Sequence, residues 1–302
     1  MTGEVPGVTH HAPYYEAVSP TYARYASVET DEEMEAASAV FNISEMRFKK
    51  LADLSDPSPE SMLAVENGHT ARVPITSQVQ MATARARDAL EAFSDLTVTA
   101  GVLRPFAHYS LIRQASEGAA LARWLLRPDK KYKRVYRSLN LEFTHDQDAR
   151  DFAATLTRTD RNAASPALDR TLTRLNELKD TVSQLRELQL KRVPSWTDIL
   201  VDISPPLGRT TSGHAPDSPV VVWKVASAFL HGSTTTARML SDLEQLTDFD
   251  ERRIASMEMK PSWRVLAASY GTCVQMLYDL QERYEYLATH DYGKRSVAAA
   301  AE

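Results

Sequence analysis

The sequence predicts an all-α protein, a multi-helix bundle with a flexible N-terminal arm. Three observations indicate this fold class. Only 10 of the 302 residues are glycine, and long stretches are rich in the helix formers Ala, Leu, Arg, Glu and Gln. Apolar residues recur at steps of three and four along several segments, which places them on one face of a helix. Prolines and glycines gather between these segments, where helices begin and end.

These signals place the elements in order along the chain. Residues 1–30 hold three prolines and scattered tyrosines without a period, so we expect a flexible arm there. A helical bundle domain is predicted over 31–290 and a frayed, alanine-rich tail over 291–302. Within the bundle, helices are predicted at 31–54, 77–98, 105–126, 131–156, 166–191, 218–232 and 261–287.

The predicted breaks rest on proline and glycine. Pro57, Pro59 and Gly68 interrupt the chain after the first helix, and Pro128 stops the helix that begins at Pro105. A Pro-rich loop is expected at about 192–217; its short apolar run, Ile199-Leu200-Val201, predicts a turn of helix or an isolated strand. The stretch 235–259 receives no firm assignment.

Composition limits the class of protein. The net charge of −5 does not favour a polyanion as partner, and no apolar run approaches the roughly 18 residues of a membrane span. We find no secretory signal in the first residues, and the single cysteine, Cys273, has no disulfide partner. We therefore expect a cytoplasmic protein without membrane segments or cofactors.

Two polar lines on otherwise apolar helices are the strongest functional candidates. Lys224, Ser227 and His231 follow one another at i, i+3 and i+7, within about 60° of arc on the helix 218–232. On the helix 105–126, Arg113 and Glu117 share one face, and Glu117 is the only acid in a long apolar stretch. A cation, a hydroxyl and an imidazole on one stripe could stabilise an anionic transition state and move a proton.

Two interpretations of these residues remain open. Arg113, Glu117, Lys224 and His231 could form a buried structural cluster between the two helices, because a buried acid requires a partner. Alternatively, the same residues together with Ser227 could be catalytic.

A basic run between Arg123 and Arg137 is the candidate nucleic-acid surface. Aromatic side chains at 124, 132 and 136 are interleaved with the cations, as stacking of RNA bases would require. The alternative is a solvated junction between two helices, or cations at 134 and 137 that reach toward Glu117. The cations of the run are Arg123, Arg127, Lys130, Lys131, Lys133, Arg134 and Arg137.

No metal site is predicted. Glu142 and His145 have the Glu-x-x-His spacing of helical di-iron sites, but the second match, Glu66 and His69, lies in the predicted break and is not expected to be helical. The pair His10-His11 lacks a third ligand. Cys273 lies on the apolar stripe of the last helix and is expected in the core.

The stretch HYSLIRQASEGAALARWLL, with RVYR after it and WKVASAFLHG further on, resembles a family of uncharacterised bacterial helical proteins. Members show an Arg-x-x-x-Glu helix and a Trp-x-x-x-Ser-x-x-x-His-Gly helix. Arg113 and Glu117 match the first motif; Trp223, Ser227, His231 and Gly232 match the second. The resemblance covers about 105–287 and implies no activity.

A more distant similarity is to HEPN-type helical bundles, many of which are metal-independent ribonucleases of toxin and antiviral systems. Their signature is an Arg followed by a His on one helix, completed across a dimer. Here Lys224 stands in the place of the Arg, with six residues between it and His231. The similarity implies that Lys224 would stabilise the phosphorane and His231 would move the 2′-hydroxyl proton, although Lys lacks the planar fork of Arg.

The sequence thus favours a soluble helical interaction protein of unknown partner, with a structural Arg/Glu/Lys/His cluster. The alternative is a HEPN-like ribonuclease or nucleic-acid-binding protein with RNA as its partner. A homodimer is permitted by the exposed tyrosines and by the leucine-rich helix 166–191.

Overall fold

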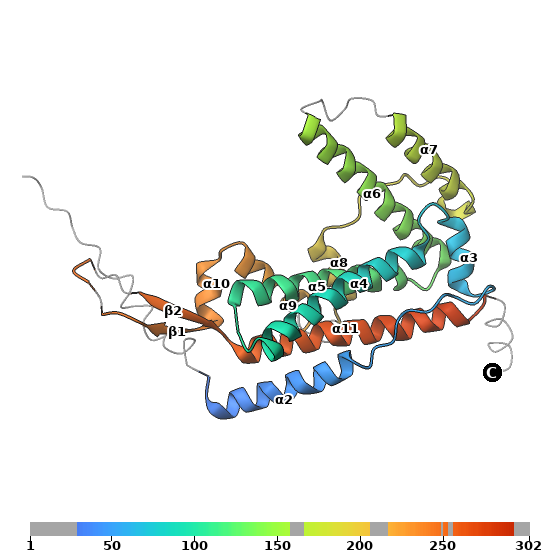
Figure 1. The fold of residues 1–302 in the computed structure, drawn as a ribbon. Helices are drawn as coiled ribbons and strands as arrows, with labels where there is room; N and C mark the ends of the chain where they lie inside the picture. Colours follow the sequence, from blue (N-terminus) through green and yellow to red (C-terminus); the bar gives the residue numbers. More distant parts are fainter. Residues whose placement is uncertain (1–28, 158–165, 206–216, 249, 253–255, 293–302) are drawn as a thin grey trace, which may run out of the picture.

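A computed structural model describes residues 29–157, 166–205, 217–248, 250–252 and 256–292. In this part of the chain helix dominates and the only strands form one short hairpin, which confirms the predicted all-α class (Figure 1). The predicted arm and tail lie almost wholly outside the described residues. None of the described helices is both long and apolar enough to cross a membrane.

The elements carry the labels of Figure 1. The helices of the first half are α2 (Asp31–Phe48), α3 (Met62–His69), α4 (Ile75–Ser94) with a π-helical end (Asp95–Thr99), α5 (Pro105–Leu126) and α6 (Lys131–Thr157). The second half has α7 (Pro166–Asp180), a 3-10 turn (Ser183–Leu185), α8 (Trp196–Ile203), α9 (Pro219–Leu230), α10 (Thr234–Met239), strands β1 (Ser241–Gln245) and β2 (Met257–Pro261), and α11 (Trp263–Thr289).

The long helix α11 runs through the middle of the bundle, with α2 on one side and α4, α5 and α9 on the other (Figure 1). Helices α4 and α5 pack closely against each other. A Cβ added at Gly118 of α5 would lie 2.6 Å from the carbonyl oxygen of Ala82 in α4, so only glycine permits this approach. Their interface is otherwise built from small side chains such as Ala86, and it belongs to the main core.

Helices α6 and α7 project away from the body of the bundle as a helical hairpin (Figure 1). A second, smaller core joins them to the 3-10 turn; its buried members are Val135, Leu139, Leu175, Leu178, Val182 and Leu185. The sequence predicts one continuous helix over this last stretch, but α7 ends at Asp180. The chain turns there because the Lys179 ammonium group donates to the carbonyl oxygens of Arg186 and Leu188, at 3.0 and 2.9 Å.

Five elements, helices α3, α8 and α10 and strands β1 and β2, lie where the sequence predicts breaks or nothing definite. Helix α3 occupies the predicted break, because the Ser61 hydroxyl accepts the backbone N–H of Ala64 as an N-cap and Met62 and Leu63 are buried. Helix α8 takes up the apolar run of the Pro-rich loop. Strands β1 and β2 pair antiparallel, with Leu243 opposite Met259, and five-residue strands are too short to show a period in the sequence.

The base of the projecting hairpin is held by a fully buried ion pair. Glu66 of α3 and Arg134 of α6 have no exposed side-chain surface. The Nε of Arg134 donates to both Glu66 oxygens at 3.0 and 3.1 Å, and Nη2 donates to Glu66 as well. Nη1 donates to the carbonyl oxygens of Pro128 and Asp129, and Nη2 also reaches the Tyr292 hydroxyl at 3.0 Å.

These bonds use all the N–H groups of the guanidinium, which is the condition for keeping such a charge in the interior. Burial alone would lower the pKa of Arg134, but hydrogen bonds and charge from Glu66 outweigh burial and raise the pKa above its usual value. Burial and the charge of Glu66 also raise the pKa of Tyr292, so its hydroxyl stays protonated and donates to Glu66. The pair therefore joins α3, the α5–α6 turn, α6 and the end of α11.

The substitution Glu66→Gln should destabilise the fold by about 3 kcal/mol, because it leaves a buried guanidinium without a counter-charge. Urea unfolding followed by circular dichroism at 222 nm measures this loss. Lys133→Gln, on an exposed residue of the same turn of α6, is the matched control and should leave the unfolding midpoint unchanged. Equal midpoints for Glu66→Gln and the wild type would contradict this account of the ion pair.

Candidate functional site

Arg113 and Glu117 form the ion pair that the sequence predicts. The Nε of Arg113 donates to Oε1 of Glu117 at 2.9 Å, one turn along α5. The same carboxylate oxygen accepts the indole N–H of Trp223 from α9 at 3.0 Å, and the Arg113 guanidinium lies 5.5 Å from the centre of the Trp223 ring. The three side chains join α5 to α9.

The other half of the predicted cluster lies elsewhere. Lys224 and His231 are exposed, and no ion pair engages either of them within the described residues. Ser227 is buried. The contact with Glu117 comes from Trp223, the residue directly before Lys224. Successive residues of a helix point about 100° apart, so with Trp223 turned toward α5, Lys224 faces solvent. The prediction that all four side chains form one buried cluster is thus corrected to Arg113, Glu117 and Trp223.

His231 is the C-cap residue of α9, and Gly232 follows it with φ +70°. The helix therefore ends where the sequence predicts, at a residue whose left-handed backbone conformation favours glycine. The imidazole lies at the carbonyl end of the helix, on the surface. Among the described residues, no carboxylate is paired with this imidazole, so the described structure does not assemble a general acid–base pair around His231.

The basic run does not form one continuous cationic face. Arg134 is fully buried against Glu66, which corrects its assignment to a nucleic-acid surface and the suggestion that it reaches Glu117. Arg137 lies over the Trp124 ring at 4.4 Å, donates to the Trp124 carbonyl and pairs with Asp202 of α8 at 3.1 Å. Lys130 and Lys133 are exposed, whereas Lys131 lies 5.6 Å from the ring centre of Tyr292.

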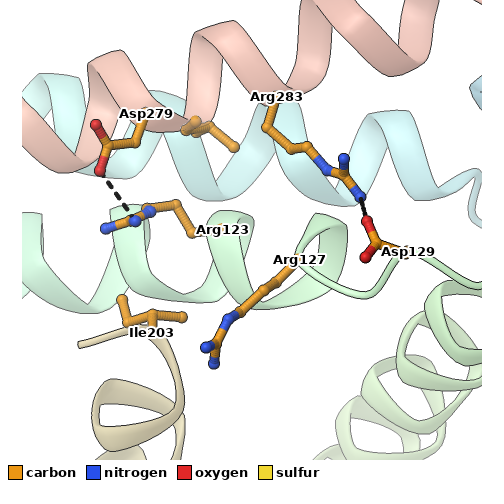
Figure 2. A pocket seen from close by; sticks show the side chains of 7 residues that line it. Arg123, Arg127, Asp129, Ile203, Asp279 and Arg283 are labelled. Atoms are coloured by element: carbon orange, nitrogen blue, oxygen red, sulfur yellow. Dashed lines mark hydrogen bonds and ion pairs between the residues drawn. The ribbon is translucent and has the colours of Figure 1, made fainter. Parts of the chain in front are cut away.

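Two further cations of the run line a pocket of about 270 Å³ at the carbonyl end of α5 (Figure 2). Its lining residues are Arg123, Arg127, Asp129, Ile203, Asp279, Leu280 and Arg283. Figure 2 shows Arg123 paired with Asp279 and Arg283 paired with Asp129, at 3.0 and 3.1 Å. Arg127 extends away from both pairs and contacts Asp202.

Two arginines that line the pocket retain N–H donors without a partner among the described residues. Among the described residues, no hydrogen bond or ion pair engages Nε and Nη1 of Arg123 or Nε and Nη2 of Arg127. Burial lowers the pKa of Arg123; Asp279 opposes this shift, and the charge of Arg127 adds to it. The lowered pKa of Arg123 thus reflects mainly the desolvation of its guanidinium, and each of the three arginines that line the pocket is paired with one acid.

The candidate metal ligands do not come together. The Glu-x-x-His pair in α3 is helical after all, but Glu66 is bound to Arg134, and Nδ1 of His69 lies 2.9 Å from the Thr181 hydroxyl. Glu142 lies 3.9 Å from His145. In the described part of the chain no group of three or more His, Cys, Asp and Glu side chains could hold a metal ion, and His10-His11 lies outside that part.

Cys273 lies in the core of α11, as the sequence predicts. Its thiol has no exposed surface, and burial raises its pKa to about 12, although a hydrogen bond with Ser116 opposes the shift. The thiolate required for nucleophilic chemistry is therefore not formed near neutral pH.

Sequence reasoning missed the residues that complete these sites from distant segments. Trp223 gave a signal, as part of the motif on its helix, but its contact with Glu117 depends on how α9 packs. No signal in the sequence indicated the roles of Asp202, Asp279 and Arg283, because single charged residues in helices are ordinarily solvated. No protein-family model, curated protein or solved structure matches the chain.

Replacing Glu117 with alanine should lower the free energy of unfolding by about 1–2 kcal/mol, because the half-buried Arg113 and the Trp223 N–H lose their acceptor. Thermal or urea unfolding measures the effect. Lys224→Ala, on the neighbouring exposed residue, is the control and should unfold as the wild type does. A larger loss in the free energy of unfolding for Lys224→Ala than for Glu117→Ala would contradict the assignment of the stabilising contact to Glu117.

Proposed function

We propose that the chain is a helical interaction protein and that its polar cluster on α5 and α9 is structural, not catalytic. One observation carries this proposal: the Glu117 carboxylate is occupied by Arg113 and Trp223, whereas Lys224 and His231 face solvent. A catalytic acid and base would need to converge within hydrogen-bond reach of one reacting atom.

The surface of the bundle supports an interaction role. Three exposed apolar side chains lie on the outer side of α2, where Val40, Ile43 and Met46 are 46, 55 and 57 % exposed. Apolar patches of this kind on soluble proteins are typical of binding surfaces. The projecting hairpin α6–α7 and the strands β1–β2 extend the surface available to a partner (Figure 1).

A ribonuclease assay distinguishes the proposal from the HEPN-like alternative. The wild-type chain should leave a fluorescent single-stranded RNA uncleaved in the absence of metal, and His231→Ala should have the same melting temperature as the wild type because the side chain is exposed. Cleavage by the wild type that is lost in a normally folded His231→Ala variant would overturn the non-catalytic proposal.

A second candidate function, binding of a phosphate group, is favoured by the arginine pocket. Arg123, Arg127 and Arg283 line one cavity and retain donors beyond those paired with acids. Arginine binds phosphate through two parallel N–H groups. The phosphate could belong to a small ester or to the backbone of RNA, since both present the same non-bridging oxygens, and the exposed Lys130 and Lys133 lie on the adjoining turn.

Titration calorimetry with inorganic phosphate, and separately with a short RNA, tests this candidate. Arg127→Met should weaken phosphate binding by about ten-fold and leave the fold intact, because Arg127 is half exposed. Lys133→Met is the control: it should change only RNA binding if the RNA backbone is the source of the phosphate. No heat with either probe, or equal losses in both variants with inorganic phosphate, would exclude the pocket as a phosphate site.

A further inference from the structure

The outward face of α2 carries an apolar stripe that no other described part of the chain covers. We call Ala36, Ala39, Val40, Ile43 and Met46 the outer stripe; all five are exposed. The opposite face of the helix, with Ala37, Phe41, Ser44 and Phe48, is buried. Helix α2 packs on α11 and forms the outermost layer on that side of the bundle (Figure 1).

The outer stripe continues into a shallow hollow beside α11. This hollow measures about 190 Å³ and is lined by Glu33, Ala36, Ala37, Val40, Arg264 and Ala268. Small side chains on both helices leave it open. A larger apolar side chain from a partner could therefore fill space next to the stripe.

Charge is divided between the two ends of α2. Its first turn contains Asp31, Glu32 and Glu33, and Glu35 follows; Arg47 is in its last turn, and Lys49 and Lys50 come directly after it. The helix dipole favours this arrangement in a single helix. The dipole does not account for the exposed apolar residues between the ends. Moreover, no ion pair engages Glu32, Glu35 or Lys50 among the described residues.

When a second α2 is placed antiparallel to the first, the outer stripe and the charges of one helix are complementary to those of the other. Ala36 then lies opposite Met46, and Ala39 lies opposite Ile43, so that each large side chain meets a small one. In the same register Glu32 lies opposite Lys50. All three pairings are centred on position 41, so one two-fold axis generates them together. Within α2, residues 32, 36, 39, 43 and 46 fall within about 80° of arc.

We propose that two copies of this chain associate through antiparallel pairing of their α2 helices, with the outer stripes in contact. The proposal rests on the proposed interaction function and names the partner as a second copy. A parallel pair is disfavoured because it would place the acidic ends together and the basic ends together. One helix pair of this length forms an interface at the small end of the range for specific complexes, so the dimer is expected to be reversible.

Analytical ultracentrifugation of the full chain from about 1 to about 100 µM tests the association. The wild type should show a monomer–dimer equilibrium, and Ile43→Asp should raise the dissociation constant by about ten-fold or more, because it places a charge at the centre of an apolar contact. Met81→Asp is the matched control. Met81 is 74 % exposed on α4, away from the stripe, and its replacement should leave the equilibrium unchanged.

Charge inversion tests the antiparallel register. Glu32→Lys alone and Lys50→Glu alone should each weaken self-association. In each homodimer, like charges then lie opposite one another at both ends of the helix pair. A mixture of the two variants should form the heterodimer in preference to either homodimer, because both contacts then join opposite charges. Circular dichroism confirms that each variant is folded.

A wild type that remains monomeric over this range, or an Ile43→Asp variant that dimerises as well as the wild type, would overturn the proposal. Preference for the homodimers in the mixture would overturn the register. These results are independent of the ribonuclease assay: a monomer that cleaves no RNA contradicts self-association alone, whereas RNA cleavage contradicts the non-catalytic function.

Discussion

The buried pair of Glu66 and Arg134 is the interaction on which the arrangement of the molecule depends. Helices α6 and α7 have their own small core and project from the bundle, and the buried pair holds the base of α6 to the bundle. There, one guanidinium is bonded to α3, to the carbonyl oxygens of the α5–α6 turn and to Tyr292 after α11. An ion buried so completely is tolerated only when each donor is satisfied, and this requirement fixes the relative positions of four segments.

The same use of arginine extends over the whole end of the bundle where α5 gives way to α6. Arg283 of α11 donates to the carbonyl oxygen of Leu126, which the end of α5 leaves without a helical partner, and to that of Pro128 in the α5–α6 turn. Arg127 and Arg137 share Asp202 of α8, and of the two the more buried Arg137 also contacts α5 through the Trp124 carbonyl. Most cations of the basic run thus form contacts that join helices. What remains available to a ligand is the pocket and the exposed lysines beside it.

The two proposed binding features differ in physical character. The arginine pocket is a polar cavity whose donors suit a compact anion, and it lies at the junction of α5, α8 and α11. The outer stripe of α2 is an exposed apolar surface between charged helix ends, suited to another helix. Because they use different residues, phosphate binding and self-association are separable properties. Neither requires the side chains of Lys224 or His231.

The sequence by itself determined the all-α class and several helix boundaries, because periodicity, prolines and caps are local signals. Helix α5 runs from Pro105 to Leu126 and α9 ends before Gly232, both as predicted. The local i, i+4 pair of Arg113 and Glu117 was predictable for the same reason. Of the candidate site, only this ion pair could be predicted from the sequence.

Only the tertiary structure decided which charges are paired and buried. It turned Trp223 instead of Lys224 toward Glu117, joined Arg134 to Glu66 across 68 positions of sequence, and brought Asp202 and Asp279 to the basic run. The physical reason is that the state of a charged side chain depends on the solvent and partners around it, and packing between helices distant in sequence sets both.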